Sequence, residues 1–236
     1  MNEKPVAIIG AMPVEIEALL EVAEIEKTEE IASMTFHLGT LCGMPIVTAV
    51  CGAGKVNSAL CAQVMIDHFS PRLVLNIGVA GGLGPVKIGD VVIATHCCQH
   101  DYDLTADGEH TMGEVPVPPV GDYVRNFPCD KELSDWLADA ARTIYPNVYR
   151  GPIATGDQFI ASNEKANRLH EDFGALACEM EGASIAHACL LNGVPCMVLR
   201  TISDNGNDDA VVDFPTFAKQ SAHQAQQLLT RIVSEL

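Results

Sequence analysis

Residues 6–20 of the chain read VAIIGAMPVEIEALL. The β-branched run over residues 6–10 predicts a short buried strand. Pro13 suits the first turn of a helix, and apolar residues then recur at helical spacing as far as residue 20. The stretch therefore predicts a strand, a glycine turn and a helix, which is the repeating unit of an α/β protein.

The alternation of strands and helices continues along the chain. Residues 34–41 and 44–49 flank Cys42-Gly43, a pattern typical of a β-hairpin. Periodicity predicts further helices at 55–69, 131–145, 163–170, 180–192 and 214–236, and further strands at 73–77, 90–95, 148–155, 175–179 and 194–203. We therefore expect an α/β fold, with three α/β/α layers around a central mixed, mostly parallel sheet, and residues 1–236 as a single domain.

Composition and charge restrict the partners of the protein. The 236 residues carry a formal net charge of −17, with 48% hydrophobic and 19% charged residues. A surface this acidic repels nucleic-acid phosphates and anionic membranes. The first residues resemble no signal peptide, and no apolar run is long enough to span a bilayer. We therefore expect a cytoplasmic protein with no nucleic-acid partner and no membrane partner.

Four short clusters follow predicted strands, at the edge where open α/β sheets bind their ligands. These clusters are residues 10–15, 78–82, 178–182 and 203–206. Their glycines allow a backbone to approach a ligand closely, and helix N-termini offer N–H donors. Glu15, Glu181 and Asp204 add carboxylates at this edge. An acidic residue in the first turn of a helix is also an ordinary partner of the helix dipole, so each cluster alone is a weak signal.

The clusters belong to a longer series of segments that resembles a known family. The segments are IGAM at 9–12 with Glu15, GAGKV at 52–56, NIGVAGG at 76–82, KIGD at 87–90, TGDQFI at 155–160, EME at 179–181 and RTISD at 200–204. In this order and spacing they resemble the nucleoside phosphorylase superfamily, and specifically the bacterial 5′-methylthioadenosine/S-adenosylhomocysteine nucleosidases. The resemblance implies a nucleoside phosphorylase-like fold. It also implies hydrolysis of the N-glycosidic bond of S-adenosylhomocysteine and 5′-methylthioadenosine, which releases adenine and the 5′-thio-substituted ribose.

The resemblance implies two catalytic carboxyl groups. Asp204 would protonate the departing adenine at N7 with Ser203 orienting its carboxyl group, and this role requires a raised pKa for Asp204. Glu15 would activate the attacking water. Glu181 would accept hydrogen bonds from the ribose 2′ and 3′ hydroxyls and stabilise positive charge on the sugar. Arg200 is expected near Glu181 or the water, and its alternative is a buried ion pair.

Further positions are expected to bind the substrate. Phe159 would stack on the purine, the Ile160 backbone would read its Watson–Crick edge, and Phe214 would line the 5′ side. The remaining substrate-binding positions that the resemblance implies are Ala11, Val79, Gly81, Glu179 and Met180. The family often has serine at the position of Val79, so a hydroxyl that could hold the water or the ribose is absent there.

The irregular segment 99–128 is long for a connection within a domain and indicates a functional or interface loop. The resemblance implies a homodimer in which this loop completes the partner's 5′ pocket, and it assigns Ala53, Leu104, Asp107 and Glu109 to that contact. The family commonly has aromatic residues where Asp107 and Glu109 stand. Their carboxylates would favour a 5′ substituent that bears an ammonium group, such as homocysteine, unless both simply face solvent.

No metal and no cofactor are expected. The nine cysteines include no Cys-x-x-Cys pair and lie mostly in apolar runs, which is typical of buried free thiols. His100, Asp101 and Asp103 could ligate a metal, but no second cluster matches them. Residues 204–209 look like a calcium loop, although Pro215 stands where the loop needs its glutamate.

Three other functions are compatible with parts of the pattern. A phosphorylase would need arginines to hold phosphate, yet none lies in residues 10–15 or 78–82, and Glu15 would repel the anion. A hydrolase of futalosine-type nucleosides fits the same motifs. A nucleoside-binding sensor would be the alternative if Glu15 or Asp204 were mispositioned.

Overall fold

The structure is a computed structural model that describes residues 4–119, 121–207 and 210–233, with only the backbone described at 211–216, 218 and 233. Its helices are α1 (Pro13–Leu20), α2 (Lys55–Phe69), the 3-10 helix η1 (Thr105–Asp107), α3 (Lys131–Ala141), α4 (Asn163–Phe173), α5 (Gly182–Asn192) and α6 (Ala210–Val233). Its strands are β1 (Val6–Gly10), β2 (Glu24–Ile31), β3 (Met34–Leu41), β4 (Met44–Val50), β5 (Leu73–Gly82), β6 (Val91–Gln99), β7 (Val115–Val117), β8 (Asp122–Val124), β9 (Phe127–Pro128), β10 (Val148–Thr155), β11 (Ala177–Glu179) and β12 (Cys196–Asp204).

One large mixed sheet forms the centre of the fold, so the expected fold class is confirmed. Its strand order is β11-β10-β6-β12-β5-β1-β4-β3-β2, with β9 paired to β6. The pairs of β1 with β4 and β5, and of β12 with β5, are parallel, whereas β6 runs antiparallel to β12. β11 pairs with β10 and also with β5. This second pairing brings β11 beside the ends of β5 and β12.

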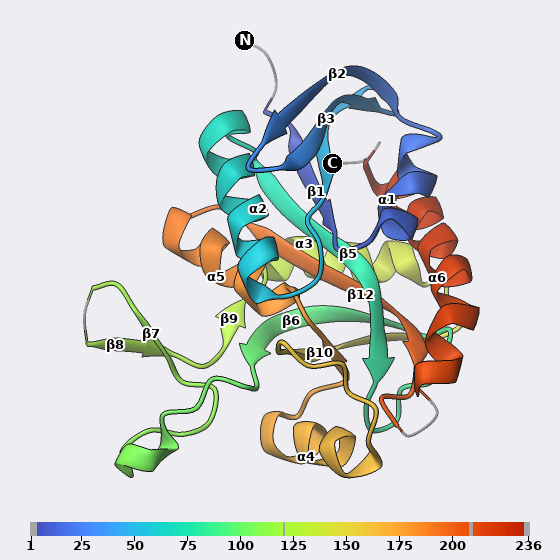
Figure 1. The fold of residues 1–236 in the computed structure, drawn as a ribbon. Coiled ribbons are helices and arrows are strands. Elements are labelled where there is room, and N and C mark those ends of the chain that lie inside the picture. The colour runs from blue at the N-terminus through green and yellow to red at the C-terminus, as the bar shows by residue number, and fades with distance from the viewer. Residues whose placement is uncertain (1–3, 120, 208–209, 234–236) are drawn as a thin grey trace.

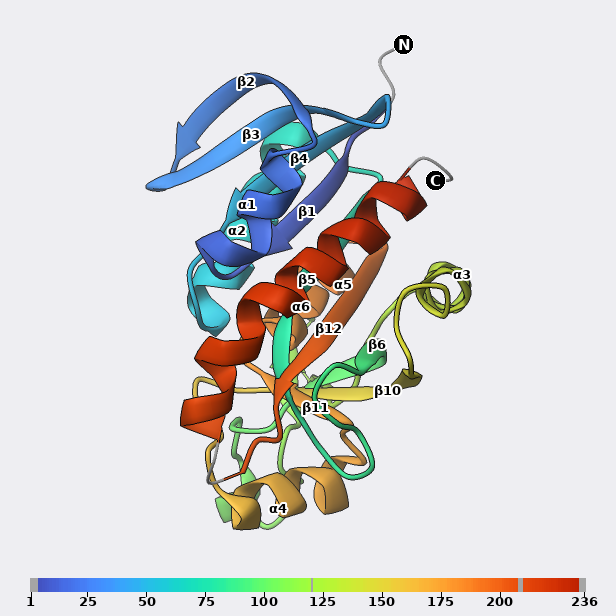
Figure 2. The ribbon, with the colours of Figure 1, turned by 90° about the vertical axis from the view of Figure 1, so that its right-hand side faces the viewer.

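Helices cover both faces of the sheet (Figures 1 and 2). Strands β1, β5 and β12 are buried along their whole length, which fits the apolar sequence of β1 and the apolar residues that open β5 and β12. On one face the core includes side chains of α2 and α5. On the other face it includes side chains of α1, α3 and α6. The three expected layers are therefore present.

The structure differs from the sequence-based prediction at several elements. The strand β2 was not predicted, because its sequence EIEKTEEI is dominated by charged residues. The predicted hairpin is confirmed between β3 and β4, and both turn residues adopt positive φ, with Cys42 at 51° and Gly43 at 82°. The irregular segment contains η1 and the short strands β7, β8 and β9. Helix α6 begins at Ala210, four residues before its predicted start at Phe214, and residues 234–236 of the predicted helix lie outside the described part.

Among the residues that the structure describes, no helix is both long enough and apolar enough to cross a membrane.

Candidate active site

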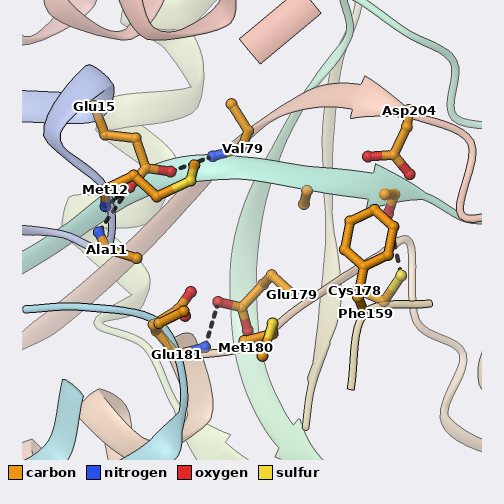
Figure 3. A pocket seen from close by; sticks show the side chains of 13 residues that line it. Ala11, Met12, Glu15, Val79, Phe159, Cys178, Glu179, Met180, Glu181 and Asp204 are labelled. Carbon is orange, nitrogen blue, oxygen red and sulfur yellow. Dashed lines mark hydrogen bonds between the residues drawn. The ribbon is translucent and has the colours of Figure 1, made fainter. Parts of the chain in front are cut away.

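A cavity of ≈ 230 Å³ opens where β1, β5, β11 and β12 end. Its lining comes from these four strands and the segments that follow them, together with Ala53 in the turn that precedes α2 and Phe159 in the segment after β10. The lining residues are Ala11, Met12, Glu15, Ala53, Val79, Ala80, Gly81, Phe159, Cys178, Glu179, Met180, Glu181 and Asp204. Glu15 and Asp204 lie at opposite ends of this cavity (Figure 3). The four clusters expected from the sequence therefore meet in one place.

Backbone N–H groups that follow β1 and one within β5 hold the Glu15 carboxylate. Its Oε2 accepts from the N–H groups of Ala11 at 2.6 Å and Met12 at 2.9 Å, and its Oε1 accepts from Val79 N–H at 3.1 Å. Glu15 is 4% exposed, and burial raises the pKa of its carboxyl group despite the opposing charge of Arg200. Since Oε1 has only one of these donors, it keeps a lone pair that can face a water molecule. Glu15 thus caps α1 and lines the cavity.

Glu181 lies on the wall between the two ends. Its Oε1 accepts from Gly54 N–H at 2.9 Å, and it makes no side-chain capping hydrogen bond to α5, at whose N-terminus it stands. Burial, and then the neighbouring Glu179 carboxylate, raise the pKa of Glu181 to about 7. Its Oε2 is 3.7 Å from Arg200 Nη2.

Arg200 is fully enclosed in the sheet and pairs with Glu179 rather than with the cavity. Arg200 Nη2 donates to Glu179 Oε2 and to Asn76 Oδ1. Glu179 also accepts from the Thr155 hydroxyl and from the N–H groups of Glu181 at 2.9 Å and Gly182 at 2.8 Å. The two alternatives for Arg200 are both met, because it forms a buried ion pair and lies near Glu181.

Asp204 is aimed by an irregularity at the end of β12. Ile202 pairs with Ala80 and Asp204 with Gly81, so Ser203 is an extra residue in the ladder. Such a bulge changes the face toward which the next side chain points. Ser203 Oγ donates to Asp204 Oδ2 at 3.0 Å, and Gly206 N–H donates to Oδ1 at 2.8 Å. The expected contact between Ser203 and Asp204 is therefore present.

The Asp204 end of the cavity carries an aromatic ring and a thiol. Phe159 is 51% exposed and lies beside Asp204 and Cys178 (Figure 3). Ile160 is buried and lines a small adjoining cavity of ≈ 40 Å³ together with Phe159. Cys178 is a free thiol whose Sγ donates to Gly81 O at 3.6 Å. An open aromatic face next to a buried carboxyl group can receive a flat heterocycle.

The residues expected to contact a partner subunit divide into two groups. Ala53 lines the cavity, whereas Leu104, Asp107 and Glu109 do not. Asp107 accepts from the N–H groups of Glu109 at 2.9 Å and His110 at 3.1 Å, within its own exposed turn. The predicted contact of Phe214 lies outside the described residues, because its side chain is not described.

Several residues that shape the site were not identified from the sequence. Cys178 and Met12 line the cavity, and Asn76, Thr155 and Gly54 hold its charged side chains. Contacts across 127 residues, such as Gly54 N–H to Glu181, leave no local signal. The threonine and the glycine stood inside recognised segments, but only the fold assigns them partners.

Within the described residues, no group of three or more His, Cys, Asp or Glu side chains has the arrangement of a metal site.

Comparison with known proteins places this geometry in a family. The family model described as "Phosphorylase superfamily" matches residues 5–234. Among curated proteins, the chain is 37% identical to the aminodeoxyfutalosine nucleosidase of Campylobacter jejuni, covering 98% of this chain and 99% of that protein. It is 35% identical to the 5′-methylthioadenosine/S-adenosylhomocysteine nucleosidase of Actinobacillus succinogenes, again covering 98% of this chain and 99% of that protein.

Two solved structures are similar over nearly the full chain. The 5′-methylthioadenosine/S-adenosylhomocysteine nucleosidase of Neisseria meningitidis, in complex with methylthio-immucillin-A, has a TM-score of 0.91 and 37% identity, covering 99% of this chain and 100% of that one. The native futalosine hydrolase of Helicobacter pylori has a TM-score of 0.89 and 36% identity, covering 99% of this chain and 98% of that one. The resemblance found in the motifs is confirmed.

Proposed function

This chain belongs to the phosphorylase superfamily, and from that premise we propose that it is a nucleosidase that hydrolyses the N-glycosidic bond of 5′-methylthioadenosine and S-adenosylhomocysteine. The observation that carries the proposal is the pair of buried carboxyl groups, Glu15 and Asp204, at opposite ends of one cavity. Loss of adenine needs a proton donor on the adenine side of the glycosidic bond and a proton acceptor on the side from which water attacks. The relatives with this activity match over nearly the full chain.

Asp204 is the proposed acid. The departing adenine gains negative charge, and a proton donated to N7 by Asp204 neutralises it. Ser203 Oγ and Gly206 N–H, at 3.0 Å and 2.8 Å, fix the orientation of the carboxyl group. Phe159, beside Asp204, is the proposed stacking surface for the purine, and the backbone of Ile160 is the proposed reader of its edge. The raised pKa that this role requires of Asp204 is part of the proposal.

Glu15 is the proposed base and Glu181 the proposed ribose ligand. The raised pKa of Glu15 brings a carboxylate closer to the basicity needed to accept a proton from water. Glu181 accepts hydrogen bonds from the sugar hydroxyls. Its negative charge, together with those of Glu15 and Glu179, stabilises a cationic ribosyl group. Arg200 offsets part of this negative charge through its buried ion pair with Glu179.

Water rather than phosphate is the proposed nucleophile. Within the described part of the chain, the cavity lining contains no lysine and no arginine. Arg200, the guanidinium nearest to Glu15, is engaged by Glu179, Asn76 and Leu199 O. A phosphate dianion beside Glu15 would meet an uncompensated like charge, which opposes phosphorolysis.

A second candidate substrate is aminodeoxyfutalosine. The support is that the Campylobacter jejuni relative, at 37% identity over 232 residues, acts on that nucleoside by name. The chemistry at the scissile bond is the same, and only the 5′ substituent differs. The carboxylates of Asp107 and Glu109 would instead favour the ammonium group of S-adenosylhomocysteine, if a partner subunit's loop reaches the pocket.

The complete enzyme that we propose is a cytoplasmic homodimer that uses a small adenine nucleoside. Support comes from a groove of ≈ 750 Å³ along α2 and α5, bordered by Tyr102 and Val115 of the irregular segment. Val56, Leu60 and Leu191 are 77%, 46% and 49% exposed there. Exposed apolar side chains of this number on neighbouring helices are typical of an interface. In a dimer formed at this groove, each copy would place its Leu104, Asp107 and Glu109 near Ala53 of the other copy.

The test is release of adenine from 5′-methylthioadenosine, S-adenosylhomocysteine and aminodeoxyfutalosine, with and without phosphate. We expect release from the first two in phosphate-free buffer and no increase on adding phosphate. Release only with phosphate would make the protein a phosphorylase. Release from aminodeoxyfutalosine alone would select the second candidate, and release from none would favour a nucleoside-binding sensor.

A further inference from the structure

Three segments that are distant in sequence meet at the N-terminus of α2, through Lys55, Asp101 and Asp157. Lys55 is the first residue of α2, Asp101 follows β6, and Asp157 follows β10. Lys55 Nζ donates to Asp101 Oδ1 at 2.6 Å, Asp157 N–H donates to Asp101 Oδ2 at 2.8 Å, and Lys55 N–H donates to Asp157 Oδ1 at 2.8 Å. The three contacts close on themselves, and we name the set the Lys55–Asp101–Asp157 triangle.

The triangle supplies what the local sequence of α2 lacks. The residue before the helix is Gly54, which has no side chain with which to cap it. Asp157 provides the missing acceptor from 102 positions away. Gly54 has φ of +99°, and a Cβ atom there would lie 3.0 Å from Asp157 Oδ1, so glycine allows this close approach.

The charged pair within the triangle is sheltered from solvent. The side chains of Lys55 and Asp101 are 18% and 14% exposed. Burial acts to raise the pKa of the Asp101 carboxyl group, but the Lys55 ammonium and the Asp157 N–H hold that pKa below its ordinary value. Exposed ion pairs contribute little to stability, whereas this one joins two loops and a helix terminus through both carboxylate oxygens.

Lys55 and Asp157 each lie within two residues of a group that contacts the cavity or its charged side chains. Gly54, next to Lys55, donates its N–H to Glu181 Oε1 at 2.9 Å. Phe159, two residues after Asp157, lies on the cavity wall near Asp204. Glu15 and Asp204 take their own hydrogen bonds from other segments, at residues 11–12, 79, 203 and 206. The triangle therefore touches the binding wall and leaves the two proposed proton-transfer groups alone.

We propose that Lys55, Asp101 and Asp157 are positioning residues that hold Gly54 against Glu181 and Phe159 against the base, and so set the affinity for the adenine nucleoside. This inference rests on the proposed function. A broken triangle frees the N-terminus of α2 and the segment after β10, which weakens binding of sugar and purine together. Proton transfer by Asp204 and Glu15 continues in the molecules that do bind.

The test compares Asp101→Asn with the wild type in steady-state kinetics and thermal unfolding. The substitution keeps the size of the side chain, but the amide oxygen can accept from only one of its two donors. We expect KM to rise about tenfold, kcat to change less than about threefold, and the pH profile of kcat to stay in place. Lys55→Met should likewise raise KM with little change in kcat, and Lys55→Arg should keep most of the wild-type affinity. The matched control is Arg168→Met, which breaks the exposed Arg168–Glu164 pair and should leave both constants unchanged.

A purely structural role gives a different pattern. In that case Asp101→Asn lowers the melting temperature, and kcat falls with the folded fraction while KM stays constant, which overturns the proposal. An equal rise of KM in Arg168→Met overturns it as well, because the effect would then follow from loss of any ion pair.

Amide hydrogen exchange of the free protein separates this inference from the proposed function. Peptides covering residues 53–58 and 155–161 should exchange faster in Asp101→Asn than in the wild type, and equally in Arg168→Met. Unchanged exchange in both peptides overturns the triangle even if adenine is released. A wild type that releases no adenine, with the expected exchange pattern, overturns the proposed function and leaves the triangle as an observed link between the two segments.

Discussion

At the scale of single residues, the donors around each carboxyl group determine what it can do. Asp204 accepts hydrogen bonds from Gly206 N–H at Oδ1 and from Ser203 Oγ at Oδ2. Glu15 has backbone donors on both oxygens, two on one and one on the other. Serine can turn its hydroxyl to suit a protonated or an ionised carboxyl group, whereas backbone N–H groups favour the ionised form. The surroundings thus match an acid at Asp204 and a base at Glu15.

The role of Asp204 predicts the effect of its nearest isostere. Asp204→Asn should lower kcat by about 10²–10⁴-fold, because an amide cannot supply the proton to adenine. Gly206 N–H can still donate to the amide oxygen, so the melting temperature should change little. Ser203→Ala serves as a milder companion that disturbs orientation but keeps the acid. An Asp204→Asn enzyme with more than about a tenth of the wild-type kcat would exclude Asp204 as the acid.

Glu181 links activity to stability through its ionisation. The ordinary pKa of its carboxyl group is 4.5, and burial and Glu179 raise the pKa to about 7 in the folded protein. Between these two values the folded chain keeps a proton that the unfolded chain has lost. The contribution of Glu181 to the free energy of unfolding therefore falls as pH rises from about 4.5 to 7 and is constant above that range.

Glu181→Gln removes this ionisation and should separate the two effects. The variant should gain stability relative to the wild type as pH rises from 5 to 8, by at most about 3 kcal/mol, while its kcat/KM falls. Urea unfolding at pH 5 and pH 8 measures the first effect, and adenine release measures the second. A wild type that becomes more stable relative to the variant over this range would contradict a raised pKa for Glu181.

Some residues of the site could be located from the sequence, and others could not. Glu15, Glu181 and Asp204 each follow a glycine-rich or strand-ending segment, so pattern and resemblance together located them. Thr155 and Gly54 act on the site through long-range hydrogen bonds, to Glu179 and Glu181. Such bonds depend on how strands are ordered in the sheet, and periodicity does not specify that order.

At the scale of elements, the close fit of β5 against α1 and β12 fixes Glu15. Gly78 of β5 pairs with Arg200 in the neighbouring strand. A Cβ atom at Gly78 would lie 2.6 Å from Glu15 Oε1 and 3.5 Å from Arg200 Nη1. A space this small excludes every side chain larger than hydrogen.

Gly78→Ala should therefore displace Glu15 from Val79 N–H and lower kcat by about 100-fold or more. The matched control is Gly82→Ala in the same strand, whose new methyl group would meet Ile202 and Val86 and not Glu15. Both variants should lose stability, but only Gly78→Ala should lose more activity than its folded fraction explains. Circular dichroism melting combined with kcat at a temperature where both are folded provides the measurement. Equal losses of kcat in the two variants would argue against a specific role for Gly78.

The elements also explain where prediction from sequence failed. The apolar runs in β1 and at the start of β5 and β12 indicated these strands, because burial on both faces favours apolar residues at every position. The prediction for β5 ended at residue 77, whereas the strand continues to Gly82. The edge strand β2 presents charges toward solvent and reads as a loop, although charges on an edge discourage pairing with another sheet. The bulge at Ser203 that aims Asp204 is a property of the pairing with β5 and has no signature in the order of residues.

At the scale of the whole molecule, net charge and exposed apolar surface act in opposite directions on the proposed dimer. With a net charge of −17, copies of this chain repel one another, so an interface must supply enough apolar contact to overcome that repulsion. The groove along α2 and α5 exposes Val56, Leu60 and Leu191 and is the proposed place for this contact. Tyr102 and Val115 of the irregular segment border the same groove, so in the proposed dimer the same contact would complete the 5′ pocket.

This coupling predicts the outcome of charging the groove. Leu60→Glu should shift the protein from dimer to monomer in light scattering coupled to size exclusion, because an unpaired carboxylate would be buried at the interface. Adenine release from 5′-substituted nucleosides should fall with the dimer fraction and recover in part at high protein concentration. Val22→Glu makes the same change at a side chain 47% exposed and away from the groove lining, and it should keep both dimer and activity. A monomeric Leu60→Glu enzyme with full activity would mean that each chain closes its own 5′ pocket, and Leu104, Asp107 and Glu109 would then have no role in choosing the substrate.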